Sequence, residues 1–208
     1  MSINKISNVL TNNIQNGAAK AMLYGVGLKD TDFNKYMVGV GSMQFDINPC
    51  NKHLGKLQNI AKKSINNSEM VGFNFNTIGV SDGLTNGNSG MHYSLPSREL
   101  IADSIETMVN AHHLDGFVLI PGCDKNIPAS MMAMGRINRP SILLYGGTML
   151  PGKFKNNNVD IVDAFQSYGQ LIENKITPEE RENLLKSCCH KSGGSCSGMY
   201  TCNTMATI

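Results

Sequence analysis

The sequence predicts an α/β fold, a mostly parallel sheet flanked by helices, on three observations. Short apolar runs recur along the chain, each about as long as a buried strand. Amphipathic segments with helical spacing lie between these runs, and strands that alternate with helices form parallel sheets. The 208 residues are 41% hydrophobic but only 6% aromatic, with 13 methionines and no tryptophan. The core of such a fold would therefore be aliphatic and rich in methionine.

Four apolar runs are the predicted strands, and a turn-forming residue soon follows each of them. They are residues 36–40, 77–80, 117–120 and 142–145. In parallel sheets, ligands bind beyond the carboxyl ends of the strands. The first three runs lead into loops that contain Cys50, Asp82 and Cys123, respectively. We therefore expect these three side chains at one edge of the sheet.

The spacing of apolar residues predicts helices over residues 53–68 and 97–114. Ser97 would cap the second helix, with Glu99 in its first turn, where the helix dipole favours an acidic side chain. The sequence Thr-Pro-Glu-Glu at residues 177–180 is a capping box with proline at the first helical position. It predicts a third helix.

Charge and hydropathy exclude two classes of partner. The 18 basic and 16 acidic residues give a formal net charge of +2, which is not the electrostatic footprint of a nucleic-acid-binding protein. No apolar run is long enough to span a membrane. The first 17 residues are polar and rich in asparagine, without the apolar core of a signal peptide. We therefore expect a cytoplasmic protein.

Six cysteines in a reducing compartment favour metal ligands, catalytic groups or buried thiols over disulfides. None forms a Cys-x-x-Cys pair, which argues against a zinc ribbon, although a structural zinc protein stays open. Cys50, Cys123 and Cys196 lie in glycine or proline contexts on predicted loops. Three such thiolates could hold an iron–sulfur cluster with one open iron position, as a Lewis acid needs. The alternative that each is a small buried hydrophobic residue has equal weight.

Asp82 and Asp124 each follow a predicted strand, and carboxylates on neighbouring loops suit Mg²⁺. Ordinary turn chemistry is the stronger explanation for either aspartate taken alone. Lys125 could be a salt-bridged surface lysine, or could be deprotonated and modified beside a metal.

Five strings, in this order, resemble the dihydroxy-acid dehydratase family, whose wider group includes sugar-acid dehydratases. They are Asn48-Pro49-Cys50-Asn51, Val80-Ser81-Asp82-Gly83, YSLPSRELIADS at residues 93–104, Pro121-Gly122-Cys123-Asp124-Lys125-Asn126, and GSCSGMYT at residues 194–201. The likeness runs from about residue 21 to the last residue. We therefore expect an N-terminal arm over residues 1–20 and an α/β cluster- and metal-binding domain over residues 21–208. No internal repeat divides the chain, and residues 153–158 are its most loop-like stretch.

The resemblance implies a role for six residues. Cys50, Cys123 and Cys196 match the cysteines that bind the family's iron–sulfur cluster, and the resemblance suggests a [2Fe–2S] type. Asp82, Asp124 and Lys125 match its Mg²⁺ ligands, the lysine being carbamylated. No role is implied for Cys188, Cys189 and Cys202. The implied reaction removes water from a 2,3-dihydroxy carboxylate to give a 2-keto acid, in valine and isoleucine biosynthesis.

Two departures from the family pattern are visible. Family members are much longer, so we expect this chain to be the truncated N-terminal domain of a larger two-domain enzyme. That enzyme would be a homodimer that acts on small dihydroxy acids. The general base, a serine, would lie outside this chain, which would be inactive alone. His190-Lys191 replaces a Cys-Pro pair that is usual in the family. A sugar-acid dehydratase and a non-catalytic, truncated metal-binding fragment remain the alternatives.

Overall fold

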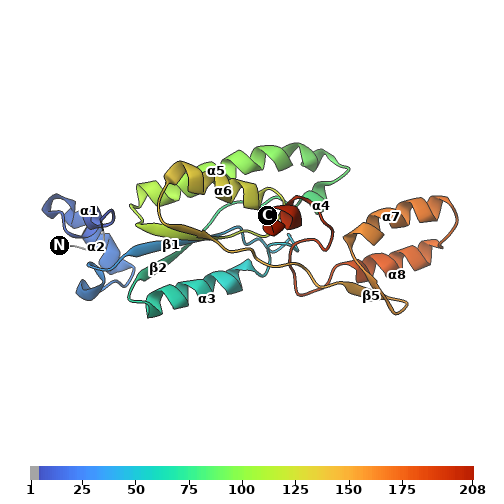
Figure 1. Ribbon diagram of the computed structural model, residues 1–208, viewed down its shortest axis with the longest axis horizontal. Coiled ribbons are helices and arrows are strands. Elements are labelled where there is room, and N and C mark those ends of the chain that lie inside the picture. The colour runs from blue at the N-terminus through green and yellow to red at the C-terminus, as the bar shows by residue number, and fades with distance from the viewer. Residues whose placement is uncertain (1–4) are drawn as a thin grey trace.

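The computed structural model describes residues 5–208, which contain a four-stranded sheet with helices on both faces (Figure 1). The strands are β1 (Met37–Ser42), β2 (Val71–Asn76), β3 (Gly116–Ile120) and β4 (Ser141–Leu143). Their order in the sheet is β2-β1-β3-β4, and all three pairings are parallel. The carboxyl ends of the strands therefore share one edge. The predicted α/β class with a mostly parallel sheet is confirmed.

Alternate residues of the strands supply two apolar layers, one on each face. Helix α3 (Leu54–Asn67) covers one face, whereas α5 (Ser94–Ala111) and α6 (Asn126–Ile137) cover the other (Figure 1). Val40 and Ile120 pack with α3. Phe117 and Leu119, which alternate along β3 with the residues that face α3, pack with α5 and α6. This period of two is what a sheet buried on both faces requires.

The remaining elements lie at the two ends of the sheet. The N-terminal region contains α1 (Asn8–Thr11), α2 (Gly17–Gly25) and the short 3₁₀ turns η1 (Ile14–Asn16) and η2 (Asp30–Asp32). Beyond the strands' carboxyl ends come α4 (Asp82–Thr85), η3 (Ser89–Tyr93) and α9 (Thr201–Thr207). Helix α2 continues past residue 20, and residues 1–4 of the expected arm lie outside the described residues. No helix within residues 5–208 is long and apolar enough to cross a membrane.

A small lobe lies at the end of the molecule opposite the N-terminal helices (Figure 1). It consists of the antiparallel hairpin β5 (Gly152–Phe154) and β6 (Asn157–Val159), followed by α7 (Ile161–Ile172) and α8 (Pro178–Cys188). Val159, Leu184 and Cys188 form its own buried cluster. After α8 the chain returns to the loop that follows β4, where Thr148 pairs with Ser195.

Two strand predictions need correction. Residues 77–80 are not a strand but the connection from β2 to α4, and the strand lies just before them at Val71–Asn76. Its inward residues include Phe73 and Phe75, but asparagines interrupt the apolar pattern and hide the strand. The last strand ends at Leu143 rather than at residue 145.

The predicted helices are confirmed, with one incorrect cap. Helix α5 begins at Ser94, so Ser97 is not its cap, and the Ser97 hydroxyl instead donates to the Ser94 carbonyl oxygen (2.5 Å). The capping box at residues 177–180 opens α8 as predicted. The loop-like stretch 153–158 is in fact most of a hairpin. At its turn, Lys155 and Asn156 both have positive φ, as tight two-residue hairpin turns require.

Buried Asp115 joins the N-terminal region to the sheet. Its carboxylate accepts hydrogen bonds from the amides of Ile6 and Ser7 (3.0 Å each), the Ser7 hydroxyl (2.6 Å) and the Met37 amide (2.9 Å). Replacement by alanine removes the acceptor that these donors share.

We expect Asp115→Ala to lower the free energy of unfolding by about 3 kcal/mol, because hydrogen bonds to a charged acceptor are the strong ones. Urea unfolding monitored by circular dichroism measures the change. Asp103→Ala, which removes an exposed partner of Arg136, is the control and should cost less than about 1 kcal/mol. Equal losses in both variants would contradict the assignment.

Candidate metal centre

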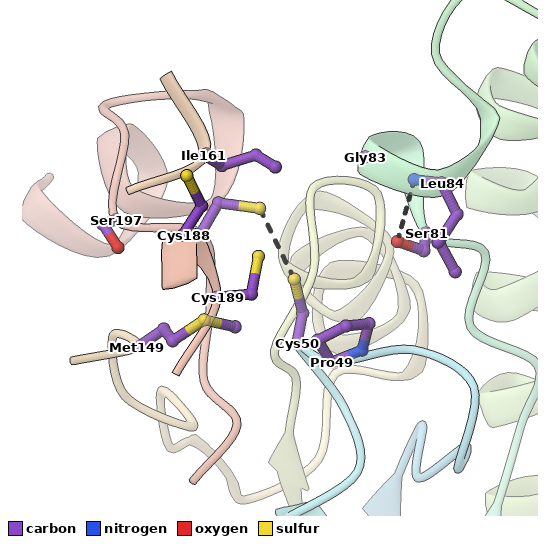
Figure 2. A pocket seen from close by; sticks show the side chains of 11 residues that line it. Pro49, Cys50, Ser81, Gly83, Leu84, Met149, Ile161, Cys188, Cys189 and Ser197 are labelled. Carbon is purple, nitrogen blue, oxygen red and sulfur yellow. Dashed lines mark hydrogen bonds between the residues drawn. The ribbon is translucent and has the colours of Figure 1, made fainter. Parts of the chain in front are cut away.

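The thiols of Cys50, Cys123 and Cys196 converge from three separate loops. Cys50 follows β1, Cys123 follows β3, and Cys196 follows the small lobe. The Cys50 sulfur lies 3.6 Å from that of Cys196, a contact marked by the dashed line from Cys50 in Figure 2. Cys123 lies near enough to Cys50 to raise the pKa of its thiol. The fold thus brings together residues up to 146 positions apart in the chain. The predicted common sheet edge accounts for Cys50 and Cys123 but not for Cys196.

Hydrogen bonds between the loops fix this convergence. The Gly194 amide donates to the Pro49 carbonyl (3.1 Å), and the Ser195 hydroxyl donates to the Gly122 carbonyl (2.5 Å). The loop of Cys196 is therefore attached to the loops of both other cysteines. Gly122 itself must lack a side chain, because a Cβ there would lie only 2.5 Å from the Cys50 carbonyl oxygen.

The pKa values of the three thiols shift in different directions. Cys50 and Cys123 are each only 3% exposed. Hydrogen bonds to Cys123 and Cys196, together with burial, raise the pKa of Cys50, and the same bonds lower the pKa of Cys123 and of Cys196. The lowered pKa values shift Cys123 and Cys196 toward the thiolate, which is the form that binds metals.

Asp82 begins α4, where Ser81 caps the helix. The Lys125 ammonium lies 2.5 Å from one Asp82 oxygen, and the Ser94 hydroxyl donates to the other (2.7 Å). Both side chains of the ion pair are largely buried. If the positive charge of this lysine were removed, the carboxylate beside it could bind a cation instead.

Asp124 lies beside this pair and accepts a hydrogen bond from the Cys202 amide (3.0 Å). Burial raises the pKa of Asp124, and the negative charge of Asp82 raises it further. Asp82, Asp124 and Cys196 line one cavity, and Cys196 also lines the adjoining cavity that contains Cys50. The carboxylate and sulfur sets therefore adjoin each other.

The two sets fit different kinds of group. Within residues 5–208, no three or more His, Cys, Asp or Glu side chains are arranged to enclose a single metal ion. Thiolates are soft ligands of the kind that zinc and iron–sulfur clusters take. The carboxylate set includes the Lys125 ammonium, which repels a cation until its charge is removed.

The other three cysteines surround the site. Cys188 and Cys189 line the same cavity as Cys50 and Cys196 (Figure 2). Cys202 is 4% exposed and lies 3.1 Å from the Ser195 hydroxyl oxygen. Burial raises the pKa of Cys188 to about 11 and that of Cys202 to about 12, so both stay protonated near neutral pH.

Sequence reasoning missed the polar residues that support the site. They are Asn48, Ser94, Ser195 and Asn203. All four lie within or near the five strings that carry the resemblance. Their positions were therefore visible, but their partners are distant in sequence and only the fold reveals them.

Comparison with known proteins identifies relatives over nearly the whole chain. The family model for the N-terminal part of dihydroxy-acid/6-phosphogluconate dehydratases matches residues 35–208. A dihydroxy-acid dehydratase of Francisella tularensis subsp. novicida is 50% identical over 98% of this chain. A mitochondrial dihydroxy-acid dehydratase of Saccharomyces cerevisiae is 52% identical over 99% of it, and a chloroplastic one of Arabidopsis thaliana 50% over 99%. The matched segments cover 36%, 36% and 34% of these relatives, so the chain spans about a third of their length.

The buried ion pair between Lys125 and Asp82 should be strongly coupled. In a double-mutant cycle with Lys125→Met and Asp82→Asn, we expect a coupling free energy of about 1–3 kcal/mol in metal-free buffer without bicarbonate. The exposed pair Lys155–Glu180, changed to methionine and glutamine, is the control and should couple by less than about 1 kcal/mol. Urea unfolding of all variants gives both values, and equal coupling in the two cycles would refute the prediction.

Proposed function

Because the chain belongs to the dihydroxy-acid/6-phosphogluconate dehydratase family, we propose that it is the N-terminal part of a dihydroxy-acid dehydratase. This hydro-lyase converts 2,3-dihydroxy-3-methyl carboxylates to 2-keto acids in valine and isoleucine biosynthesis. The observation that carries the proposal is the approach of three thiols to one another beside the carboxylates of Asp82 and Asp124.

Cys50, Cys123 and Cys196 are the proposed ligands of a [2Fe–2S] cluster. The pKa values of Cys123 and Cys196 are lowered, and loop-to-loop hydrogen bonds hold the loop of Cys196 against the other two loops. When bound, the cluster supplies a Lewis acid that assists departure of the substrate's 3-hydroxyl group. The surrounding loops bury Cys50 and Cys123, whereas Cys196 is half-buried and lines the cavity.

Asp82, Asp124 and Lys125 are the proposed ligands of Mg²⁺. When bound, the ion supplies positive charge that stabilises negative charge developing on the substrate carboxylate side. The neutral Lys125 amine takes up CO₂ and releases one proton, which gives an anionic carbamate in place of the ammonium. Ser94 and the Cys202 amide then keep the two carboxylates oriented through the hydrogen bonds that they already make.

We propose that the serine base lies outside the matched segment, so the 208-residue chain turns over no substrate by itself. The protein would act as a homodimer on a small-molecule acid in the cytoplasm. Two of the relatives are named as mitochondrial and chloroplastic enzymes. The cytoplasmic location is therefore part of this proposal and does not follow from the relatives.

A sugar-acid dehydratase is the second candidate, because the matching family model also names 6-phosphogluconate dehydratase. The relatives described above are all named dihydroxy-acid dehydratase, which favours the first candidate. Turnover of 2,3-dihydroxy-3-methylbutanoate but not of gluconate by the whole enzyme would support that preference. The reverse result would favour the second candidate.

Anaerobic reconstitution with iron and sulfide tests the proposed cluster. We expect the wild-type chain to gain visible absorption, and Cys50→Ser, Cys123→Ser and Cys196→Ser each to lose most of it, because a hydroxyl is a poor replacement for a soft thiolate ligand. Iron and sulfide analysis quantifies the loss. Cys189→Ser, in the same cavity, is the matched control and should retain the absorption. An unchanged spectrum in any of the first three variants removes that residue from the ligand set.

A further inference from the structure

Cys50 and Cys196 are in direct contact through their sulfur atoms. The two Sγ atoms lie 3.6 Å apart, as the dashed line from Cys50 in Figure 2 marks, and both residues line the same cavity. A disulfide bond needs about 2.0 Å between its sulfurs, so the two atoms must approach each other by about 1.5 Å before a bond can form.

The backbone already holds the two cysteines against each other. The Gly194 amide donates to the Pro49 carbonyl oxygen (3.1 Å). Pro49 directly precedes Cys50, and Gly194 lies two residues before Cys196. The approach of the sulfurs therefore needs rotation of two short side chains and no movement of the loops.

The two thiols differ in their access to solvent. Cys50 is only 3% exposed, whereas Cys196 is half-buried and also lines the adjoining cavity with Asp82 and Asp124. A small molecule can therefore reach the Cys196 sulfur but not the Cys50 sulfur. Cys189 is an exposed thiol on the cavity of Cys50 and Cys196, so it serves as the control for accessibility alone.

We propose that Cys50 and Cys196 form a redox-active dithiol, a modification site at which a small disulfide such as glutathione disulfide closes a reversible Cys50–Cys196 bond in the metal-free chain. The reaction requires the two thiols alone, so the inference goes beyond the proposed function. In a reducing compartment the pair stays open, and a rise in the concentration of small disulfides closes it.

The exchange proceeds in two steps. The Cys196 thiolate attacks one sulfur of glutathione disulfide, so that a mixed disulfide forms and one glutathione leaves as its thiolate. The Cys50 sulfur then attacks the Cys196 sulfur, gives up its proton and displaces the second glutathione. Two protein thiols are oxidised, and one glutathione disulfide is reduced to two molecules of glutathione, which carry away the two thiol protons.

Closure of this bond removes two of the three proposed cluster ligands together. A sulfur bound in a disulfide has no thiolate to offer a metal. This consequence rests on the proposed function, because it requires that Cys50 and Cys196 bind the cluster. The oxidised chain should therefore take up no iron until it is reduced again.

The experiment incubates the full chain, reduced and freed of metal by a chelator, with glutathione disulfide. Free thiols are then blocked by alkylation, and the chain is cleaved with trypsin and chymotrypsin. Cleavage after Tyr200 separates Cys196 from Cys202, which trypsin alone leaves on one peptide. Mass spectrometry of the unreduced peptides locates each disulfide, and circular dichroism checks that the chain is folded.

We expect a peptide that joins Cys50 to Cys196, and its loss after treatment with dithiothreitol. Cys50→Ser should stop at the mixed disulfide of Cys196 with glutathione, because the second thiol is missing. Cys196→Ser should leave Cys50 reduced, because Cys50 is buried. Cys189→Ser is the matched control and should form the Cys50–Cys196 bond as the wild type does. Unfolding in urea beforehand should abolish the preference for this pair, because the contact belongs to the fold.

Any other pair of cysteines as the main disulfide of the folded wild type, or a mixed disulfide that persists on Cys196, overturns the inference. A Cys50–Cys196 bond that forms equally well in urea also overturns it.

Anaerobic reconstitution with iron and sulfide separates this failure from failure of the proposed function. Iron uptake by the reduced chain, and none by the chain that carries the mapped bond, supports both. A reduced chain that binds no iron, or equal uptake by the two forms, overturns the proposed cluster ligands and leaves the mapped disulfide intact.

Discussion

The site depends on the hydrogen bonds that attach residues 193–196 to the loops after β1 and β3. The parallel register of β1 and β3, in which Ser42 lies opposite Ile120, brings Cys50 and Cys123 to one level of the sheet edge. Cys196 belongs to neither strand. Its position follows from two short contacts, Gly194 to Pro49 and Ser195 to Gly122. The close approach at Gly122 leaves no space for a side chain. The packing of the loops and the positions of the thiols therefore depend on the same contacts.

Electrostatics divides this edge of the sheet into two regions with different chemistry. The sulfur region is soft and polarisable, and the neighbouring Cys50 thiol lowers the pKa of Cys123 and of Cys196. The carboxylate region contains the Asp82–Lys125 ion pair and the half-buried Asp124, whose pKa is raised. Cys196 lines one cavity with Cys50 and another with Asp82 and Asp124, so the two regions are contiguous.

Local sequence patterns predicted much of this arrangement. Helices α3 and α8, strands β1 and β3, and the placement of Cys50 and Cys123 at one edge follow from periodicity, capping residues and the rules of parallel sheets. Strand β2 was missed because Asn74 and Asn76 break its apolar pattern, and the hairpin at residues 152–159 was missed because its strands are only three residues long. The positions of Cys196 and of the Asn48 partners could not be predicted, because they depend on contacts between residues far apart in the chain.

The separation of 146 positions between Cys50 and Cys196 has a consequence for the order of assembly. Synthesis from the N-terminus delivers the whole four-stranded sheet, with Cys50 and Cys123, before the small lobe and the third thiol have been made. Closing so long a loop is entropically costly and slow compared with forming the local helices. The nascent protein therefore passes through a stage with two paired sulfurs and an open third side. All three sulfurs reach their final positions only after the loop of residues 193–196 has docked against the loops that follow β1 and β3.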